Sequence, residues 1–360
     1  MKVILYGGVD FLPKEKNFEG FVHNILYRLC RPYTSDSFIF LSCGKSSSLP
    51  YNALSVFVPV PFFARSVSNI WCNNKVASVI KKNGADILIS LNGRPLPTLI
   101  HQILIISDAV DHKTIKAAAR YLHDGKPCSI ITSSAFMKEK LVKETLPEPT
   151  VFVLPQAPGL MYQPADLEKR ETVKSKYATG REYFLMPVSS APYHHIINTL
   201  KAFSQFKKWQ QTNMQLILWG NLLHAKGIGE LLQTYKYRND VKIIANTLND
   251  AGYADVVASC MAMIHLPGAD ETGIIVAEAM QCGTPVITAK AGALHETGGD
   301  AVLYCKPADI KGLADSMMKL YKDEKLRHSL IGKGLERVSL LNETTAMERL
   351  WNYIRKVVTT

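Results

Sequence analysis

The chain has 360 residues, of which 47% are hydrophobic and 20% charged. This length is enough for two domains with sizeable cores, and the composition excludes a globally disordered chain. The formal net charge of +11 and the pI near 9.2 indicate an anionic partner, which leaves nucleotides, nucleic acid and acidic membranes open. The seven cysteines show neither a CxxC pair nor metal-ligand spacing, which favours a reducing compartment.

The first residues, MKVILYGGVDF, hold too few apolar side chains for a signal peptide, and no run long enough to span a membrane follows. We therefore expect a cytoplasmic protein with at most peripheral contact at the inner face of the membrane. Residues 1–165 carry 18 Lys and Arg against 11 Asp and Glu, so the N-terminal half is the more basic one.

Short β-branched runs alternate with longer amphipathic runs in the first half of the chain. Helical patterns cover residues 20–31 and 135–144, and the predicted strands are 3–6, 38–42, 86–90, 103–107, 129–133 and 151–155. Right-handed βαβ crossovers then give a parallel sheet with helices on both faces.

The same pattern restarts after a polar, charge-mixed stretch at 164–182, with the strands YFLMPVS, LILWG, VKIIA, MAMIHL, TPVITA and AVLYC. The fold class is therefore α/β, with two doubly wound Rossmann-like domains at 1–165 and 166–340. Ligands bind such sheets at the carboxyl ends of the strands, so the loops after the C-terminal strands make Ser190 and Gly220 candidate ligand contacts.

The stretch ADETGIIVAEAMQCGTPVITA, residues 269–289, predicts a helix that opens at Thr272 and Gly273 and closes at Gly283. The free amides and positive dipole of a helix start suit a diphosphate. Glu278 lies five residues past Gly273, about 7.5 Å along the axis, where a carboxylate can accept from both ribose hydroxyls. The alternative is an ordinary helix with one solvated glutamate.

This stretch resembles the retaining glycosyltransferases of family 4, which have the GT-B fold and carry a Glu-x7-Glu signature. Asp270 stands at the first acidic position and Glu278 at the second, and GGDAVLYCKPAD (298–309) continues the match. The resemblance implies that Glu278 binds the ribose and Asp270 the hydroxyls of the transferred sugar. Amides from Thr272 through Gly273 to Ile274 would hold phosphate. Asp270 is one methylene shorter than the usual glutamate, and Glu271 beside it is expected to compensate.

Weaker resemblance covers most of the chain. NFEGFVHNILYRL (17–29) stands where the family has its glycine-rich first loop, which makes Gly20 a backbone contact to the donor diphosphate. Residues 341–360 resemble the helix that crosses back to the N-terminal domain. In ILIISDAVDH (103–112), Asp108 lies where relatives contact the donor sugar, although a helix cap is the plainer interpretation.

One departure concerns the loop after YFLMPVS. The family has Arg and Lys there to neutralise the leaving diphosphate, whereas this chain has Tyr193 and His194. Protonated His194 or His195 would replace part of that charge, and Lys226 or Lys290 would be further sources. The alternative is a pair of surface histidines in a protein without catalysis.

Two further stretches have both functional and plain interpretations. Residues 58–75 combine Phe62, Phe63 and Trp71 with basic residues, which suits an anionic membrane or a lipid-linked acceptor, or else simple core packing. Arg94 in the loop LNGRPLP is a candidate phosphate contact or a plain surface arginine.

We therefore expect a retaining glycosyltransferase that uses a nucleotide-diphosphate sugar, a glycan or lipid-linked acceptor, and neither metal nor cofactor. No nucleophile or general base stands out, which suits the internal-return mechanism usually assigned to the family. The alternative is a non-catalytic protein that binds sugar nucleotides or glycans on the same fold. Nucleic-acid binding ranks third, because the basic charge is diffuse and no recognition motif is present.

Overall fold

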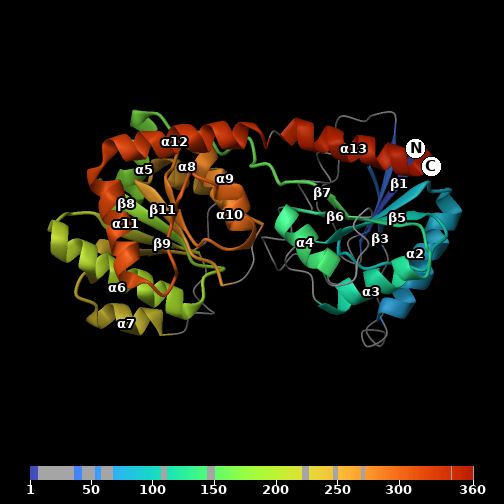
Figure 1. Cartoon of the computed structure of the whole chain (residues 1–360), viewed down its shortest axis with the longest axis horizontal. Helices are drawn as coiled ribbons and strands as arrows, with labels where there is room; N and C mark the ends of the chain where they lie inside the picture. The colour runs from blue at the N-terminus through green and yellow to red at the C-terminus, as the bar shows by residue number, and fades with distance from the viewer. Residues whose placement is uncertain are drawn as a thin grey trace. The chain divides into compact units, whose positions relative to one another are not determined.

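The computed structural model describes residues 1–6, 36–42, 53–57, 68–106, 112–143, 151–220, 227–245, 250–268, 272–341 and 343–359. The chain divides into two compact units (Figure 1). The first unit holds Met1–Pro155 together with Thr344–Thr360, and the second holds Gln156–Glu343.

The first unit is built on a seven-stranded parallel sheet of order β3-β2-β1-β4-β5-β6-β7. Its strands are β1 (Lys2–Tyr6), β2 (Ser37–Ser42), β3 (Ala53–Phe57), β4 (Ile87–Ser90), β5 (His101–Ile106), β6 (Cys128–Thr132) and β7 (Val151–Val153). Six of these strands confirm the predicted runs. β3 was not predicted, because ALSVF mixes small and polar residues and lacks a continuous apolar run.

Both faces of this sheet are covered, and alternate residues of one strand serve opposite faces. Val3 and Leu5 pack under α13 (Glu343–Thr359), whereas Ile4 and Tyr6 pack under α2 (Ser68–Asn83). Toward the other edge, α3 (His112–His123) and α4 (Ala135–Lys143) share a core with β5 and β6.

The C-terminal helix α13 is anchored by its apolar stripe. Leu350, Trp351 and Ile354 are almost fully buried in the core of the first unit, and the Trp351 ring lies 5.7 Å from that of Phe38. Full burial of side chains of this size stabilises by about 1.5–3 kcal/mol each, so the last helix is an integral part of the first unit.

The second unit has a six-stranded parallel sheet of order β10-β9-β8-β11-β12-β13. Its strands are β8 (Tyr183–Pro187), β9 (Gln215–Trp219), β10 (Val241–Ile244), β11 (Ala262–His265), β12 (Val286–Thr288) and β13 (Leu303–Tyr304). All six coincide with predicted runs. The α/β class with two Rossmann-like parallel sheets is confirmed.

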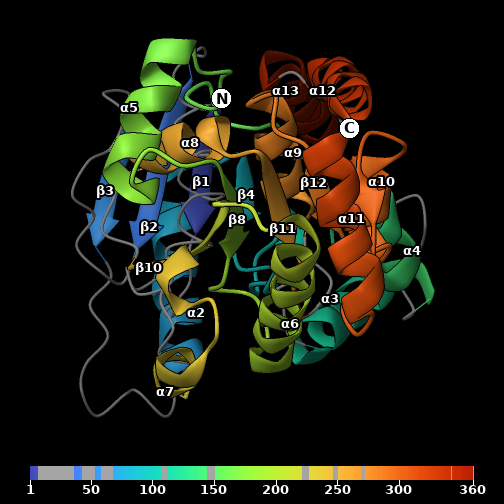
Figure 2. The ribbon, with the colours of Figure 1, turned by 90° about the vertical axis from the view of Figure 1, so that its left-hand side faces the viewer.

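Helices cover both faces of the second sheet. They are α5 (Leu167–Ala178), α6 (Tyr193–Gln210), α7 (Ile228–Thr234), α8 (Asp250–Ser259), α9 (Ile274–Gln281), α10 (Gly292–Gly298), α11 (Ile310–Lys322) and α12 (Glu324–Ser339). Aspartates open three of them: the side chains of Asp166, Asp309 and Asp323 accept from backbone amides of the first turns. Figure 2 shows α6 and α11 side by side, where Phe206 and Tyr321 meet edge to face.

The boundary between the units lies earlier than the predicted residue 165. Residues 156–166 belong to the second unit, because Tyr162 is buried in its core and Gln281 donates to the carbonyl of Gly159. The charge-mixed stretch that suggested the boundary is mostly the exposed face of α5.

In each sheet, successive strands are first added on one side of the first strand and then on its other side. β1 is followed by β2 and β3 on one side and by β4 on the other, and β8 is flanked by β9 and β11 in the same way. The loops after β8 and β11 therefore leave in opposite directions and open a crevice, which is where ligands bind in open α/β sheets.

No helix in the described part of the chain combines the length and apolar character that a bilayer crossing requires.

Candidate functional site

The candidate site begins with backbone bonds that join three neighbouring strand ends in the second unit. After β8, Val188 N–H donates to the carbonyl of Trp219 at the end of β9 (2.8 Å). Gly268 N–H, after β11, donates to the carbonyl of Ser190 (3.2 Å). The loop that follows β8 is therefore fixed to the strands on both of its sides.

Two glycines allow these loops to approach so closely. A Cβ on Gly268 would lie 2.5 Å from Cγ of Pro192, and a Cβ on Gly220 would lie 2.4 Å from Oγ of Ser189. Gly220 also has φ +127°, a conformation that other residues rarely adopt. Gly220 and Ser190, both predicted contacts, thus lie just after the carboxyl ends of β9 and β8.

Helix α6 begins at Tyr193, at the end of the loop that follows β8. Pro192 is its N-cap and provides no side-chain hydrogen bond, and its first turn contains no acidic residue. His194 is exposed, while His195 is half-buried with Nδ1 3.0 Å from the carbonyl oxygen of Leu266. Because a carbonyl only accepts, Nδ1 carries the proton in this bond. The two imidazole rings meet edge to face at 4.3 Å.

Helix α9 starts on the neighbouring strand end. It begins at Ile274, two residues later than the predicted start at Thr272, because Gly273 has φ +75° and acts as the N-cap. Thr272 Oγ1 accepts from the Ile274 amide at 3.4 Å. A Cβ on Gly273 would lie 2.2 Å from Oγ1 of Thr297 on α10, so only glycine fits there.

Both helices thus present their N-terminal ends at the same edge of the sheet. Neither has an acidic residue in its first turn, and neither N-cap residue bonds an amide through its own side chain. The amides of a helix start and its positive dipole end attract anions. This arrangement can hold a group with two negative centres, such as a diphosphate.

Glu278 lies one turn into α9 and is half-buried. Burial first, and the charge of Glu278 second, raise the pKa of Tyr253 on α8 and of the Cys282 thiol at the end of α9, the latter to about 12. The Tyr253 ring lies 5.2 Å from that of Trp219 at the end of β9. The half-buried carboxylate therefore interacts electrostatically with Tyr253 and Cys282, and is not a glutamate on an open helix face.

Eight of the predicted contacts lie in the described part of the second unit, in segments that follow the carboxyl ends of β8, β9 and β11. They are Ser190, His194, His195, Gly220, Thr272, Gly273, Ile274 and Glu278. Four predicted residues, Gly20, Asp108, Asp270 and Glu271, lie outside the described residues, as does Lys226. Within the described ranges no group of three or more His, Cys, Asp or Glu side chains is arranged to hold a metal ion.

The structure also describes two further residues that the sequence analysis considered as phosphate contacts, Arg94 and Lys290. Arg94 is half-buried in the first unit and its Nε donates to Thr114 Oγ1 at 3.4 Å, so it is not a plain surface arginine. Lys290 is exposed just before α10.

Sequence reasoning missed the residues that support the site. Thr297 packs against Gly273, Pro192 against Gly268, and Tyr253 stands beside Glu278. The available signal was the presence of glycines after β9 and β11, because their partners come from distant parts of the chain.

Residues 168–337 match the protein family described as Glycosyl transferases group 1. This part of the chain is a glycosyl transferases group 1 domain. The match covers most of the second unit, including α6, α9 and all eight described candidate contacts of that unit.

A curated relative is similar to part of the chain. N-acetyl-alpha-D-glucosaminyl L-malate synthase from Bacillus anthracis is 32% identical over 87 residues, which is 24% of this chain and 23% of that protein. The similarity thus spans less than a quarter of the relative's length.

Solved structures of glycosyltransferases share the whole fold. A glycosyltransferase from Rickettsia africae is 16% identical with a TM-score of 0.79, and covers 100% of this chain and 98% of its own. HepE from Anabaena, in complex with UDP and glucose, is 14% identical with a TM-score of 0.77 and covers 99% of each chain. The group 1 domain and its partner unit therefore have the two-domain GT-B architecture.

Proposed function

We propose that the protein is a glycosyltransferase that moves a sugar from a nucleotide-diphosphate donor to a glycan or lipid-linked acceptor with retention at the anomeric carbon. One observation carries the proposal. The starts of α6 and α9, neither of which has an acidic residue in its first turn, follow adjacent strands of the group 1 domain, and Glu278 stands one turn beyond the second of them.

The donor is assigned to the second unit. Its diphosphate would lie at the two helix starts, with the amides from Thr272 to Ile274 around one phosphate and Ser190 and Gly220 lining the crevice. Glu278 would accept from both ribose hydroxyls, about 7.5 Å further along the α9 axis. HepE, whose fold is similar, is known in complex with UDP and with UDP-glucose, which supports this class of donor.

In the reaction, the bond from the anomeric carbon to the diphosphate oxygen breaks, and a bond to the acceptor oxygen forms on the same face of the sugar. The acceptor's proton passes to the departing phosphate, so no separate base is needed. The helix starts and a protonated His194 stabilise the negative charge that develops on the diphosphate. With this counter-charge the proposal requires no metal ion or cofactor.

The contacts to the transferred sugar and to the acceptor are assigned by resemblance and by charge. By the resemblance to the family, Asp270 and Asp108 would contact hydroxyls of the sugar, with Glu271 supporting Asp270 and Gly20 approaching the diphosphate. The first unit would bind the acceptor. Its excess of basic residues favours an acidic or membrane-linked acceptor, and peripheral contact at an anionic membrane.

The test starts from thermal unfolding in the presence of UDP, GDP, ADP and their sugars. A ligand at 100 times its dissociation constant stabilises by about 2.7 kcal/mol, a shift that identifies the donor. Turnover of that donor with a glycan acceptor is then measured with and without EDTA, and the anomeric configuration of the product is read by NMR. Absence of stabilisation by every nucleotide sugar would reject the proposal, and an inverted product would reject retention.

A non-catalytic protein that binds sugar nucleotides is the second candidate, favoured by Tyr193 and His194 in place of the family's Arg and Lys. It predicts the same thermal stabilisation but no release of nucleoside diphosphate with any acceptor. Donor binding without turnover would therefore decide for this candidate.

A further inference from the structure

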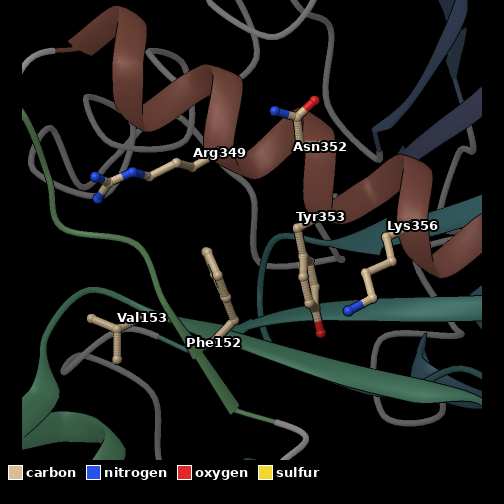
Figure 3. Close-up of a pocket in the computed structure, with 6 residues that line it drawn as sticks. All are labelled: Phe152, Val153, Arg349, Asn352, Tyr353 and Lys356. Carbon is tan, nitrogen blue, oxygen red and sulfur yellow. The ribbon is translucent and has the colours of Figure 1, made fainter.

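A second candidate site lies wholly within the first unit, between its edge strand and the C-terminal helix. The pocket has a volume of about 540 Å³ and is lined by Phe152 and Val153 of β7 and by Arg349, Asn352, Tyr353 and Lys356 of α13 (Figure 3). This volume falls within the ordinary range for sites that hold a small molecule, about 300–1,000 Å³.

Helix α13 has two faces with different tasks. Leu350, Trp351 and Ile354 are buried in the core, while the four pocket residues follow the i, i+3, i+4, i+7 spacing of a neighbouring stripe. Tyr353 of this stripe packs on the core, whereas Arg349, Asn352 and Lys356 are exposed and supply two cations and an amide.

The aromatic side chains form a fixed wall. The rings of Phe152 and Tyr353 stack with centroids 4.7 Å apart and an interplanar angle of 18°. The side chain of Ser129 is hydrogen-bonded to Tyr353 and lies 2.9 Å from Nε2 of His101. Tyr353 is thus held from the sheet side, which prepares the pocket for a ligand without a large loss of side-chain freedom.

The charge of the pocket has a single sign. Arg349 and Lys356 stand two helical turns apart, about 10.5 Å along the axis, with Asn352 between them. The six lining residues include no Asp or Glu. Two cations at this separation match two anionic groups on one extended ligand, and the amide between them suits hydroxyl groups.

We propose that this pocket binds an acidic oligosaccharide, a short sugar chain that carries carboxylate or phosphate groups. The cations bind the anionic groups, Asn352 bonds ring hydroxyls, and the C–H faces of a sugar pack on the Phe152 and Tyr353 wall. The inference is independent of the donor site, because every lining residue belongs to the first unit and none is among the donor contacts.

A membrane surface fits the pocket less well. Helices that lie on a bilayer bury exposed apolar side chains beside their basic residues. Among the described side chains of α13, none of the large hydrophobic ones is exposed, and both pocket aromatics are half-buried. The described side chains of this helix therefore offer no exposed large apolar group to a lipid surface, whereas a concave wall suits a small solute.

The experiment is calorimetric titration of the full chain, without nucleotide sugar, with an oligomer of galacturonic acid and with a neutral dextran oligomer of equal length. We expect binding of the acidic oligomer only. The double variant R349Q/K356Q should weaken it at least about tenfold, because charge-assisted hydrogen bonds are roughly twice as strong as neutral ones. Asn352→Ala should weaken it by a smaller factor.

The matched control is K81Q/K82Q, which removes two exposed cations from α2 of the same unit. Its affinity for the acidic oligomer should equal that of the unmodified chain, and both double variants should keep the unfolding temperature. Equal weakening by the two double variants would overturn the site in favour of diffuse charge. Tighter binding of uridine monophosphate, or of vesicles with 30% phosphatidylglycerol, would overturn the assignment to a saccharide.

Discussion

His195 and Leu266 are joined across two elements of the second unit: Nδ1–H of the imidazole, in the first turn of α6, donates to the backbone carbonyl just past β11, 3.0 Å away. The bond fixes the ring of His195 and the start of α6 against the neighbouring strand. His194, one residue earlier, is exposed, and its ring meets that of His195 edge to face. The two adjacent histidines thus have different tasks.

The first prediction separates these tasks by substitution. His195→Ala should lower the free energy of unfolding by about 1 kcal/mol, since it removes a hydrogen bond and leaves a carbonyl without its donor. His194→Ala should leave stability unchanged but lower turnover about a hundredfold if its charge stabilises the departing diphosphate. His194→Arg should retain activity. Urea unfolding measures the change in stability, and an assay of donor turnover measures the change in activity. Unaltered turnover in H194A/H195A would show that neither histidine takes part in the mechanism.

The second prediction concerns the ribose contact. Glu278→Ala should weaken donor binding by about 1.5–3 kcal/mol, the usual contribution of hydrogen bonds to a charged group. Titration calorimetry with the donor measures this change. The control is Glu336→Ala, which removes an exposed carboxylate from α12 and should have no effect. Equal donor affinity in folded Glu278→Ala protein would exclude the ribose assignment.

The third prediction tests the close approach at the start of α9. Gly273→Ala meets both an unfavourable φ of +75° and Oγ1 of Thr297 at 2.2 Å from the new Cβ, whereas Gly180→Ala meets the same φ, +74°, in open space. Gly180→Ala should destabilise by about 1 kcal/mol. Gly273→Ala should cost about 1–3 kcal/mol more, from overpacking, and should weaken donor binding as well. Similar unfolding midpoints for the two variants would mean that Thr297 and α10 move away from the new methyl group at little cost in free energy.

The fourth prediction is a pH dependence. Burial first, and Glu278 second, raise the pKa of the Cys282 thiol from its ordinary 9.0 to about 12. The unfolded chain therefore loses this proton above pH 9 while the folded chain keeps it, so stability falls as pH rises from about 9 to 12. Cys282→Ala should remove up to about 1.4 kcal/mol per pH unit of that slope. Chemical unfolding at several pH values tests this. Below pH 8 the free energy of unfolding should depend on pH in the same way in the unmodified protein and in Cys282→Ala.

Much of the fold could be predicted because its signals are local. Among the residues that the structure describes, twelve of thirteen strands coincide with apolar runs, since a parallel sheet covered on both faces needs continuous apolar strands. The strand that was missed, Ala53–Phe57, is an edge strand of its sheet, and its sequence ALSVF lacks the continuous apolar run of the other strands. The unit boundary was misplaced because polarity marked the outer face of α5, whereas the packing of Tyr162 decided which unit its segment joins.

The sequence by itself determined the α/β class, the two sheets and the helix that carries Glu278. These features follow from periodicity and glycine positions, both of which act over a few residues. The tertiary structure decided which side chains meet: His195 with Leu266, Gly273 with Thr297, and Phe152 with Tyr353. The members of each pair come from different secondary-structure elements, and only the packing of the sheets and helices fixes such distances.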